Sequence, residues 1–276
     1  MAGVLDKRDT DGMSPELGRD PAIVRPTEAQ RRIDVSRRQP DASLAAWVDY
    51  VWIVRWDTAE PYEQQLIPQP VVHVAAEQGR LLVHGVARGT FTRTLEGVGH
   101  VVGVAFRPGG FRPFVDVSVG TWSDRVVPAG DVLGTDDRDV AAHLLEPDRT
   151  DDELADGLCG YLLSIDAQPD PVVDEVAALV ETAERDRAIT RAEQLADHAG
   201  VGLRTLQRRF SDYVGIGPKW VIQRFRLLDA AAAAHSGEPT DWAALAVDLG
   251  FSDQSHLVRA FTAVVGTPPA TYESTA

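Results

Sequence analysis

Two observations predict an α+β fold class for this chain of 276 residues. In the first half, short β-branched runs alternate with Gly, Pro and polar residues at a spacing of about ten residues, which is typical of a β-barrel or sandwich. Near the C-terminus, one helix-turn-helix pattern occurs twice. We therefore expect an N-terminal β-barrel, then helices, and then an all-α domain that contains two helix-turn-helix units.

The composition limits the class of protein. A hydrophobic content of 44% is enough for two cores in a chain of this length. The sequence has no apolar run long enough to cross a membrane, and its N-terminus lacks the apolar core of a signal peptide. We therefore expect a soluble, cytoplasmic protein with no membrane partner. Cys159 is the single cysteine, which excludes an internal disulfide and a cysteine-based zinc site.

Residues 1–40 predict a largely disordered arm, because Arg, Asp, Gln and Pro dominate and apolar residues are scattered. The alternative is a basic arm that touches DNA or a membrane. Its candidate residues are Arg31, Arg32, Arg37 and Arg38. The interspersed acidic residues cancel much of this charge and favour the disordered tail.

Residues 41–130 predict the β-rich domain. An apolar stretch at Trp47–Trp56 precedes five β-type runs, which are Gln64–Pro68, Val71–Ala75, Arg80–Val86, Thr90–Leu95 and Val98–Phe106. Aromatic residues in such a domain can line a pocket, although more often they form plain core. The candidates here are Trp47, Trp52, Trp56 and Phe106.

Residues 131–186 predict an acidic helical connector. Amphipathic patterns cover Arg138–Leu145, Asp152–Leu163 and Val172–Glu184. Residues 126–184 contain 16 acidic and 2 basic side chains and so carry −14 of the formal net charge of −15. The C-terminal residues 185–276 are neutral, with 10 side chains of each sign. The overall negative charge therefore does not exclude contact between the C-terminal domain and DNA.

The C-terminal domain, residues 187–276, contains the repeated pattern. One copy runs from Leu195 to Phe210 and is followed by Gly215 and Pro218; the other runs from Leu245 to Phe261 and is followed by Gly266 and Pro269. Between them, Pro218 can begin a linker helix that ends near His235. At 1.5 Å per residue this helix is about 26 Å long, which suits two recognition helices in major grooves roughly 34 Å apart.

Helical periodicity separates the core residues of each recognition helix from its outward residues. In the first helix, about residues 203–211, Leu206 and Phe210 should face the core. The outward residues are then Arg204, Gln207 and Arg208, with Arg209 toward the flank. In the second helix, about residues 254–263, Leu257 and Phe261 should face the core. The outward residues are then Gln254, Ser255, Val258 and Arg259.

These side chains are of the types that read DNA. Arg can bind guanine O6 and N7 together, Gln suits adenine, and Val or Ser can contact a thymine methyl group. The alternative is a set of ordinary solvated surface residues. The double motif favours contact with bases or phosphates, most strongly for Arg208 and Arg259.

The C-terminal motif also carries a family resemblance. The sequence Ala246-x3-Gly250-Phe251-x-Asp253-x2-His256-Leu257-x-Arg259-x-Phe261-x4-Gly266-x2-Pro269-x2-Tyr272-Glu273 resembles the C-terminal motif of AraC/XylS-type transcription regulators. The first copy is similar to the other helix-turn-helix of that family, and the resemblance covers about residues 188–274. One departure is Gly202, which stands where the family usually has a Ser N-cap. The resemblance implies that the outward residues named above contact bases.

The N-terminal half is similar to an uncharacterised, cupin-like domain that precedes AraC-type DNA-binding domains. The similarity rests on four segments, Leu44–Trp52, Leu66–His73, Gly103–Gly110 and Asp124–Pro128. It implies a module that senses an effector or dimerises, and it identifies no ligand-binding residue.

The only candidates for a metal site are His73, Glu77, His84 and His100. A cupin metal site needs a close His-x-His pair on one strand, which this chain lacks, so we predict no metal and no cofactor.

We therefore predict a sequence-specific DNA-binding transcription regulator that is not an enzyme. Its partners are double-stranded DNA and an unidentified small-molecule effector, with RNA polymerase and a second copy of the chain as further candidates. Two alternatives stay open: a cupin-like enzyme and a protein-interaction module, each with an appended DNA-binding domain. The sequence shows no nucleophile elbow or P-loop, which disfavours the common forms of the enzyme.

Overall fold

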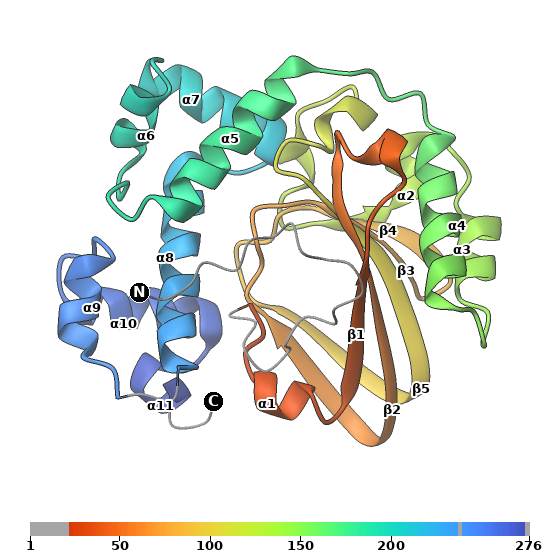
Figure 1. Cartoon of the computed structure of the whole chain (residues 1–276), viewed down its shortest axis with the longest axis horizontal. Coiled ribbons are helices and arrows are strands. Elements are labelled where there is room, and N and C mark those ends of the chain that lie inside the picture. Colours follow the sequence, from red (N-terminus) through yellow and green to blue (C-terminus); the bar gives the residue numbers. More distant parts are fainter. Residues whose placement is uncertain (1–21, 237–238, 274–276) are drawn as a thin grey trace.

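The computed structural model describes residues 22–236 and 239–273 (Figure 1). It has an antiparallel sheet of six strands in the order β1-β2-β5-β3-β4-β6, which confirms the predicted α+β fold class. The strands are β1 (Ile33–Arg38), β2 (Val48–Leu66), β3 (His73–Glu77), β4 (Arg80–His84), β5 (Phe91–Phe106) and β6 (Val126–Pro128). Within the described chain β1 and β6 have no hydrogen-bonded neighbour on their outer sides, so the sheet is curved but not closed by backbone pairing.

The long antiparallel strands β2 and β5 differ from the short runs that the sequence predicts. β2 continues for 19 residues through Glu60, Pro61 and Glu63, and a register irregularity between Thr58 and Tyr62 absorbs the break in its pattern. Such a bulge bends a strand without ending it. The predicted break between Leu95 and Val98 is likewise absent, because β5 passes through it.

The predicted disordered arm, residues 1–40, is wrong for residues 22–40. This segment contains α1 (Pro26–Ala29) and the edge strand β1, which pairs with β2 along Ile33–Arg38. Arg38 binds Asp151 and Asp152, and Arg55 of β2 also binds Asp151. One of the charges that make this segment resemble a disordered tail, that of Arg38, is therefore paired with carboxylates more than a hundred positions away. Residues 1–21 lie outside the described residues.

The two faces of the sheet have different roles. Along β3, Val74 and Ala76 belong to the main hydrophobic core, whereas His73, Ala75 and Glu77 line a cavity on the opposite face. This is the two-residue alternation that a strand imposes. On the core face lie the predicted connector helices α3 (Arg138–Leu144) and α4 (Asp151–Leu163), which contact β2, β4 and β5 (Figure 1).

Short elements connect the sheet to these helices. They are the 3-10 helices η2 (Ala42–Leu44), η3 (Arg112–Phe114) and η4 (Val119–Trp122) and the helix α2 (Ala129–Leu133). The third predicted connector helix, α5 (Pro171–Arg185), packs instead against the C-terminal helices and joins their core.

The C-terminal helices form two similar units on either side of one long helix (Figure 1). The first unit has α6 (Ala192–His198), α7 (Leu203–Arg209) and a π-helical turn η5 (Phe210–Val214). The linker helix is α8 (Pro218–Ala234), one residue shorter than predicted at its C-terminus. The second unit has α9 (Trp242–Asp248), α10 (Gln254–Val265) and α11 (Pro269–Glu273).

The repeated glycines have one conformational cause. Gly200 and Gly250 follow the first helix of each unit with φ of +63° and +77°, in the left-handed region that favours glycine. At Gly250 a Cβ atom would also lie 2.3 Å from a methyl carbon of Thr190, which is too close for any side chain. The turn between the two helices of the second unit therefore requires glycine at this position.

Buried Arg226 of the linker helix α8 forms hydrogen bonds with the C-terminal end of α5. Its guanidinium donates to the carbonyl oxygens of Ala183 at 2.7 Å and Asp186 at 3.0 Å, and it forms an ion pair with Asp229 at 2.8 Å. These carbonyl groups lie at the C-terminal end of α5, where helix carbonyls lack internal partners. The side chain is only 2% exposed.

Candidate nucleic-acid interface and ligand cavity

The first recognition helix has the faces that periodicity predicts. Leu206 and Phe210 are fully buried. Arg204, Gln207 and Arg208 are exposed. Gly202 is the N-cap residue of α7 and supplies no side-chain hydrogen bond, so the helix starts without the usual side-chain cap. The helix presents two arginines and one glutamine to solvent from consecutive turns.

Arg209 is held differently from its neighbours. Its side chain is half-buried, and its guanidinium forms an ion pair with Glu175 of α5 at 2.9 Å. Nearby, the hydroxyl of Tyr213 donates to Asp170 at 2.6 Å. The acidic connector therefore contacts the first helix-turn-helix unit through Glu175 of α5 and through Asp170, the residue before α5. The ion pair with Glu175 engages Arg209, the arginine that the sequence predicts at the flank.

The second recognition helix, α10, is longer and better capped. Asp253 accepts a hydrogen bond from the backbone N–H of His256 at 2.7 Å, as an N-cap residue should. Leu257 and Phe261 are fully buried. The residues predicted to point outward are exposed at Gln254, Ser255 and Arg259 and half-buried at Val258.

Four carboxylates of the acidic segment are paired with arginines of the N-terminal part of the chain. Asp137 is buried and accepts from Arg80, and Asp174 accepts from Arg107 at 3.0 Å. Together with the pairs of Asp151 and Asp152 described above, these contacts neutralise carboxylates against arginines of the β-domain. The segment of charge −14 is therefore less negative locally than its sequence indicates.

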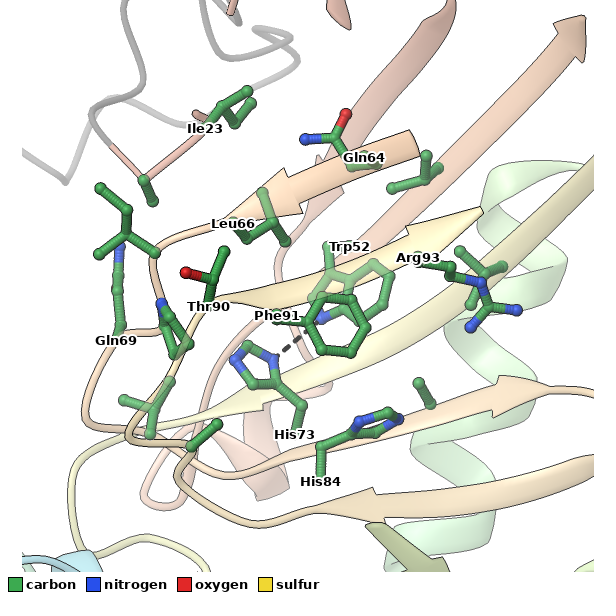
Figure 2. Close-up of a pocket in the computed structure, with 18 of the residues that line it drawn as sticks. Ile23, Trp52, Gln64, Leu66, Gln69, His73, His84, Thr90, Phe91 and Arg93 are labelled. Atoms are coloured by element: carbon green, nitrogen blue, oxygen red, sulfur yellow. Dashed lines mark hydrogen bonds between the residues drawn. The ribbon is translucent and has the colours of Figure 1, made fainter. Parts of the chain in front are cut away.

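A cavity of about 390 Å³ lies on the face of the sheet opposite α3 and α4. This volume is within the range of small-molecule sites. Its walls are mainly aliphatic and aromatic side chains from β1, β2, β3 and β5, and Figure 2 shows Trp52, Phe91, His73, His84 and Arg93 around it. Among the described residues, no three His, Cys, Asp or Glu side chains are grouped as metal ligands.

The polar groups of the cavity form two pairs. The indole N–H of Trp52 donates to Nδ1 of His73 at 3.3 Å (Figure 2). Nε2 of His84 lies 2.6 Å from Oε1 of Glu77, and the other carboxylate oxygen of Glu77 forms an ion pair with Arg93. Burial lowers the pKa of both His73 and His84 from 6.5 to about 4.

The aromatic and metal-site candidates that the sequence offers do not all lie at the cavity. Of the four aromatic candidates only Trp52 lines the cavity. Trp47 and Phe106 pack against Phe114 at ring distances of 5.4 Å and 5.3 Å, and Trp56 donates to the carbonyl of Glu96. His100 lies elsewhere, 2.8 Å from the carbonyl oxygen of Leu144.

The same cavity includes residues that sequence analysis does not single out. Phe91 and Arg93 face it from β5, and Gly89 and Thr90 come from the loop before β5. Their alternation with exposed neighbours along β5 is the only sequence signal for this role.

The rim of the cavity is bonded to the second helix-turn-helix unit and its linker helix. Thr90 donates to the carbonyl oxygen of Val264 in α10. The carbonyl of Arg88 accepts from buried Arg224 of α8 at 2.7 Å, and Ile23 accepts from the hydroxyl of Tyr272 at 3.2 Å. Three contacts therefore join the loop before β5 and the start of the described chain to α8, α10 and α11.

The first unit contacts a different part of the β-domain. Ser118 donates to the carbonyl of Ser211 at 3.0 Å, and Ser123 donates to that of Gly215. Arg112 forms an ion pair with Asp212 at 3.3 Å. Both helix-turn-helix units therefore have polar contacts with the β-domain.

None of the helices in the described segments has the length and hydropathy needed to cross a membrane.

Two segments of the chain match known domain families. Residues 36–128 match a domain of unknown function, DUF6597, and residues 195–275 match a helix-turn-helix domain family. A protein of Streptomyces lividans described as an AraC-like transcription regulator is 39% identical over 105 residues. This match covers 37% of the chain and 33% of the Streptomyces protein, so the chain spans about a third of that relative.

Crystal structures of ToxT from Vibrio cholerae resemble this one weakly. One has a TM-score of 0.41 at 11% identity and covers 88% of this chain and 98% of ToxT. Another, with a bound unsaturated fatty acid, has a TM-score of 0.36 at 10% identity and covers 88% and 94%. Likeness at this level does not relate the sites of the two proteins. Residues 195–275 therefore match a helix-turn-helix domain family, and the β-domain before them matches DUF6597.

Proposed function

We propose that this protein is a sequence-specific DNA-binding transcription regulator whose affinity for DNA depends on a small-molecule effector. The observation that carries the proposal is the pair of helices α7 and α10, each with exposed Arg and Gln side chains opposite two buried residues, which are Leu206 and Phe210 at α7 and Leu257 and Phe261 at α10. They belong to a domain of the AraC type, and they flank a linker helix of 17 residues.

In this proposal α7 and α10 enter successive segments of the major groove. Arg208 and Arg259 take guanine O6 and N7, and Gln207 and Gln254 take adenine. Ser255 and Val258 contact thymine methyl groups. Arg204, on the outward face one turn before Arg208, contacts a base or a phosphate, and Arg209 at the flank contacts a phosphate after release from Glu175.

The effector part of the proposal rests on how the β-domain is joined to the DNA-binding domain. The cavity provides room for a small molecule, and its rim bonds to α8 and α10 through Arg88 and Thr90. A ligand that shifts this loop changes the position of the second recognition helix relative to the first. Differential affinity of the ligand for the two arrangements then becomes differential affinity for DNA.

Selection from random duplex DNA tests the first part of the proposal. The full chain should enrich a site with two short conserved segments whose centres are about 10 base pairs apart, one turn of B-DNA. A second round uses duplexes with one such site, so that dimerisation on paired sites cannot add affinity. Enrichment of no motif, at a salt concentration that still permits binding to random DNA, would refute sequence-specific recognition.

A further inference from the structure

The cavity lies on the face of the sheet opposite α3 and α4, and it takes no part in the proposed reading of DNA. Its ligand is unassigned. Most of its lining surface is apolar, with side chains such as Ile33, Trp52, Leu66, Phe91 and Leu95. An apolar cavity of this size favours ligands that bury hydrocarbon or aromatic surface. A sugar with many hydroxyl groups would leave most of those groups without partners, at a cost for each.

At one end of the cavity, the negative charge of Glu77 is balanced by the positive charge of Arg93. Glu77 is 4% exposed and has both carboxylate oxygens engaged, one by Arg93 and one by His84. Its charge and that of Arg93 cancel. His73 and His84 are neutral near pH 7, because burial lowers the pKa of each to about 4. A charged ligand would lose its hydration at this end and gain no unpaired counter-charge.

The other charged lining residues also have partners. The guanidinium of Arg37 lies 4.5 Å from the centre of the Tyr50 ring, Asp124 binds Arg88, and Arg125 donates to the carbonyl of Thr121. A guanidinium that stacks on a ring or donates to one carbonyl keeps further N–H groups, so the exclusion of an anion rests on the other end of the cavity, where His73 lies opposite His84 and the Glu77–Arg93 pair offers no counter-charge.

One donor is left over at His73. An indole nitrogen can only donate, so Nδ1 of His73 must accept the hydrogen bond from Trp52. In a neutral imidazole the hydrogen then resides on Nε2. The described residues give this N–H no acceptor, and the ring lines the cavity (Figure 2). The buried donor is therefore available to a ligand.

We infer that the cavity binds an uncharged, largely apolar small molecule that accepts a hydrogen bond, through a carbonyl or hydroxyl oxygen, from Nε2 of His73. Trp52 and Phe91 offer aromatic surface beside that donor. The inference rests on the proposed role of the β-domain as the effector-binding module. Its test uses no DNA, so the two proposals can fail separately.

Three naphthalenes of similar size test separately whether the ligand needs a hydrogen-bond acceptor and whether it must be uncharged. They are 2-acetylnaphthalene with a neutral carbonyl, 2-isopropylnaphthalene with no acceptor, and 2-naphthoate with a negative charge. Each is measured by displacement of Nile red from the full-length protein at pH 7.5. The acetyl compound should bind about 3–10-fold more tightly than the isopropyl compound, the value of one hydrogen bond. The naphthoate should bind more weakly than both.

Variants locate the site. His73→Phe should bring the ratio of acetyl to isopropyl affinity close to one, because it removes the donor and keeps a flat ring. Val54 lines the cavity, so Val54→Trp should weaken all three ligands. The matched control is Val98→Trp on the same sheet, at a side chain that is 81% exposed, and it should leave the three affinities unchanged.

The three affinities can be compared in the wild-type protein, so this part of the test does not depend on whether a variant folds. Naphthoate binding as tight as that of 2-acetylnaphthalene would overturn the assignment of an uncharged ligand. An acetyl preference that persists in folded His73→Phe would overturn the role of His73. Binding that Val54→Trp and Val98→Trp affect equally, or no binding of any of the three compounds, would overturn the site itself.

Discussion

At the scale of single residues, the arginines of the first recognition helix are not equivalent. Arg208 is exposed, whereas Arg209 of α7 forms an ion pair with Glu175 of α5. A carboxylate beside the proposed DNA-binding face repels phosphate and competes for the guanidinium. Glu175 therefore has the position and the charge to oppose DNA binding.

Glu175→Gln should strengthen DNA binding by about 2–5-fold at low salt. The gain is modest because both side chains of the pair are partly exposed and screened by solvent. It should shrink as salt rises, since the Debye length falls from about 10 Å at 0.1 M to about 3 Å at 1 M. Fluorescence anisotropy with a single-site duplex measures the affinities.

Glu181→Gln is the matched control, because Glu181 lies on the same helix and pairs only locally with Arg185 at 2.9 Å. If the two variants raise the affinity equally, the effect is one of net charge and the Glu175–Arg209 pair has no special role.

At the scale of elements, α8 depends on its attachment to α5. Two arginines bind Asp229, buried Arg226 and exposed Arg187, but only Arg226 also satisfies the carbonyl groups of Ala183 and Asp186. Buried polar groups that lose a partner are costly, whereas exposed ion pairs contribute little.

Arg226→Met should therefore lower the free energy of unfolding by about 2–4 kcal/mol, because it leaves buried carbonyl groups unpaired. Arg187→Met removes an exposed partner of the same carboxylate and should cost about 0–1 kcal/mol. Urea denaturation of the full chain measures both variants. Equal, small losses would show that the carbonyl contacts of Arg226 do not stabilise the junction of α5 and α8.

The elements also show what the sequence could predict. The helices of the C-terminal domain follow from local signals, such as Gly250 after α9 and the N-cap Asp253 before α10, and their outward faces follow from the spacing of Leu257 and Phe261. Strand β1 could not be predicted from its own sequence, because it is stabilised by pairing with β2 and by the ion pair of Arg38 with Asp151, far along the chain. The hydrogen bond of His73 with Trp52 and the Glu175–Arg209 pair are long-range in the same sense. No local pattern encodes them.

At the scale of the whole molecule, the β-domain bonds to each helix-turn-helix unit at a different place. Ser118 meets the first unit at Ser211, and the loop of Arg88 and Thr90 meets α8 and the second unit. A continuous hydrophobic core extends from the sheet into the C-terminal helices. The relative position of the two recognition helices therefore depends on α8 and on the β-domain together. A change at the rim of the cavity can alter how well both helices fit one face of DNA.

The central claim is that one chain reads two groove segments with α7 and α10, and hydroxyl-radical footprinting of the full chain on its selected site tests it most directly. We predict two protected segments about 10 base pairs apart. Arg208→Ala should lose protection at one segment and Arg259→Ala at the other, each with a loss of about 1–3 kcal/mol in specific binding. Arg138→Ala, at an exposed arginine of α3, should change neither segment. A single protected segment, or two variants that weaken specific and random DNA binding equally, would contradict the account.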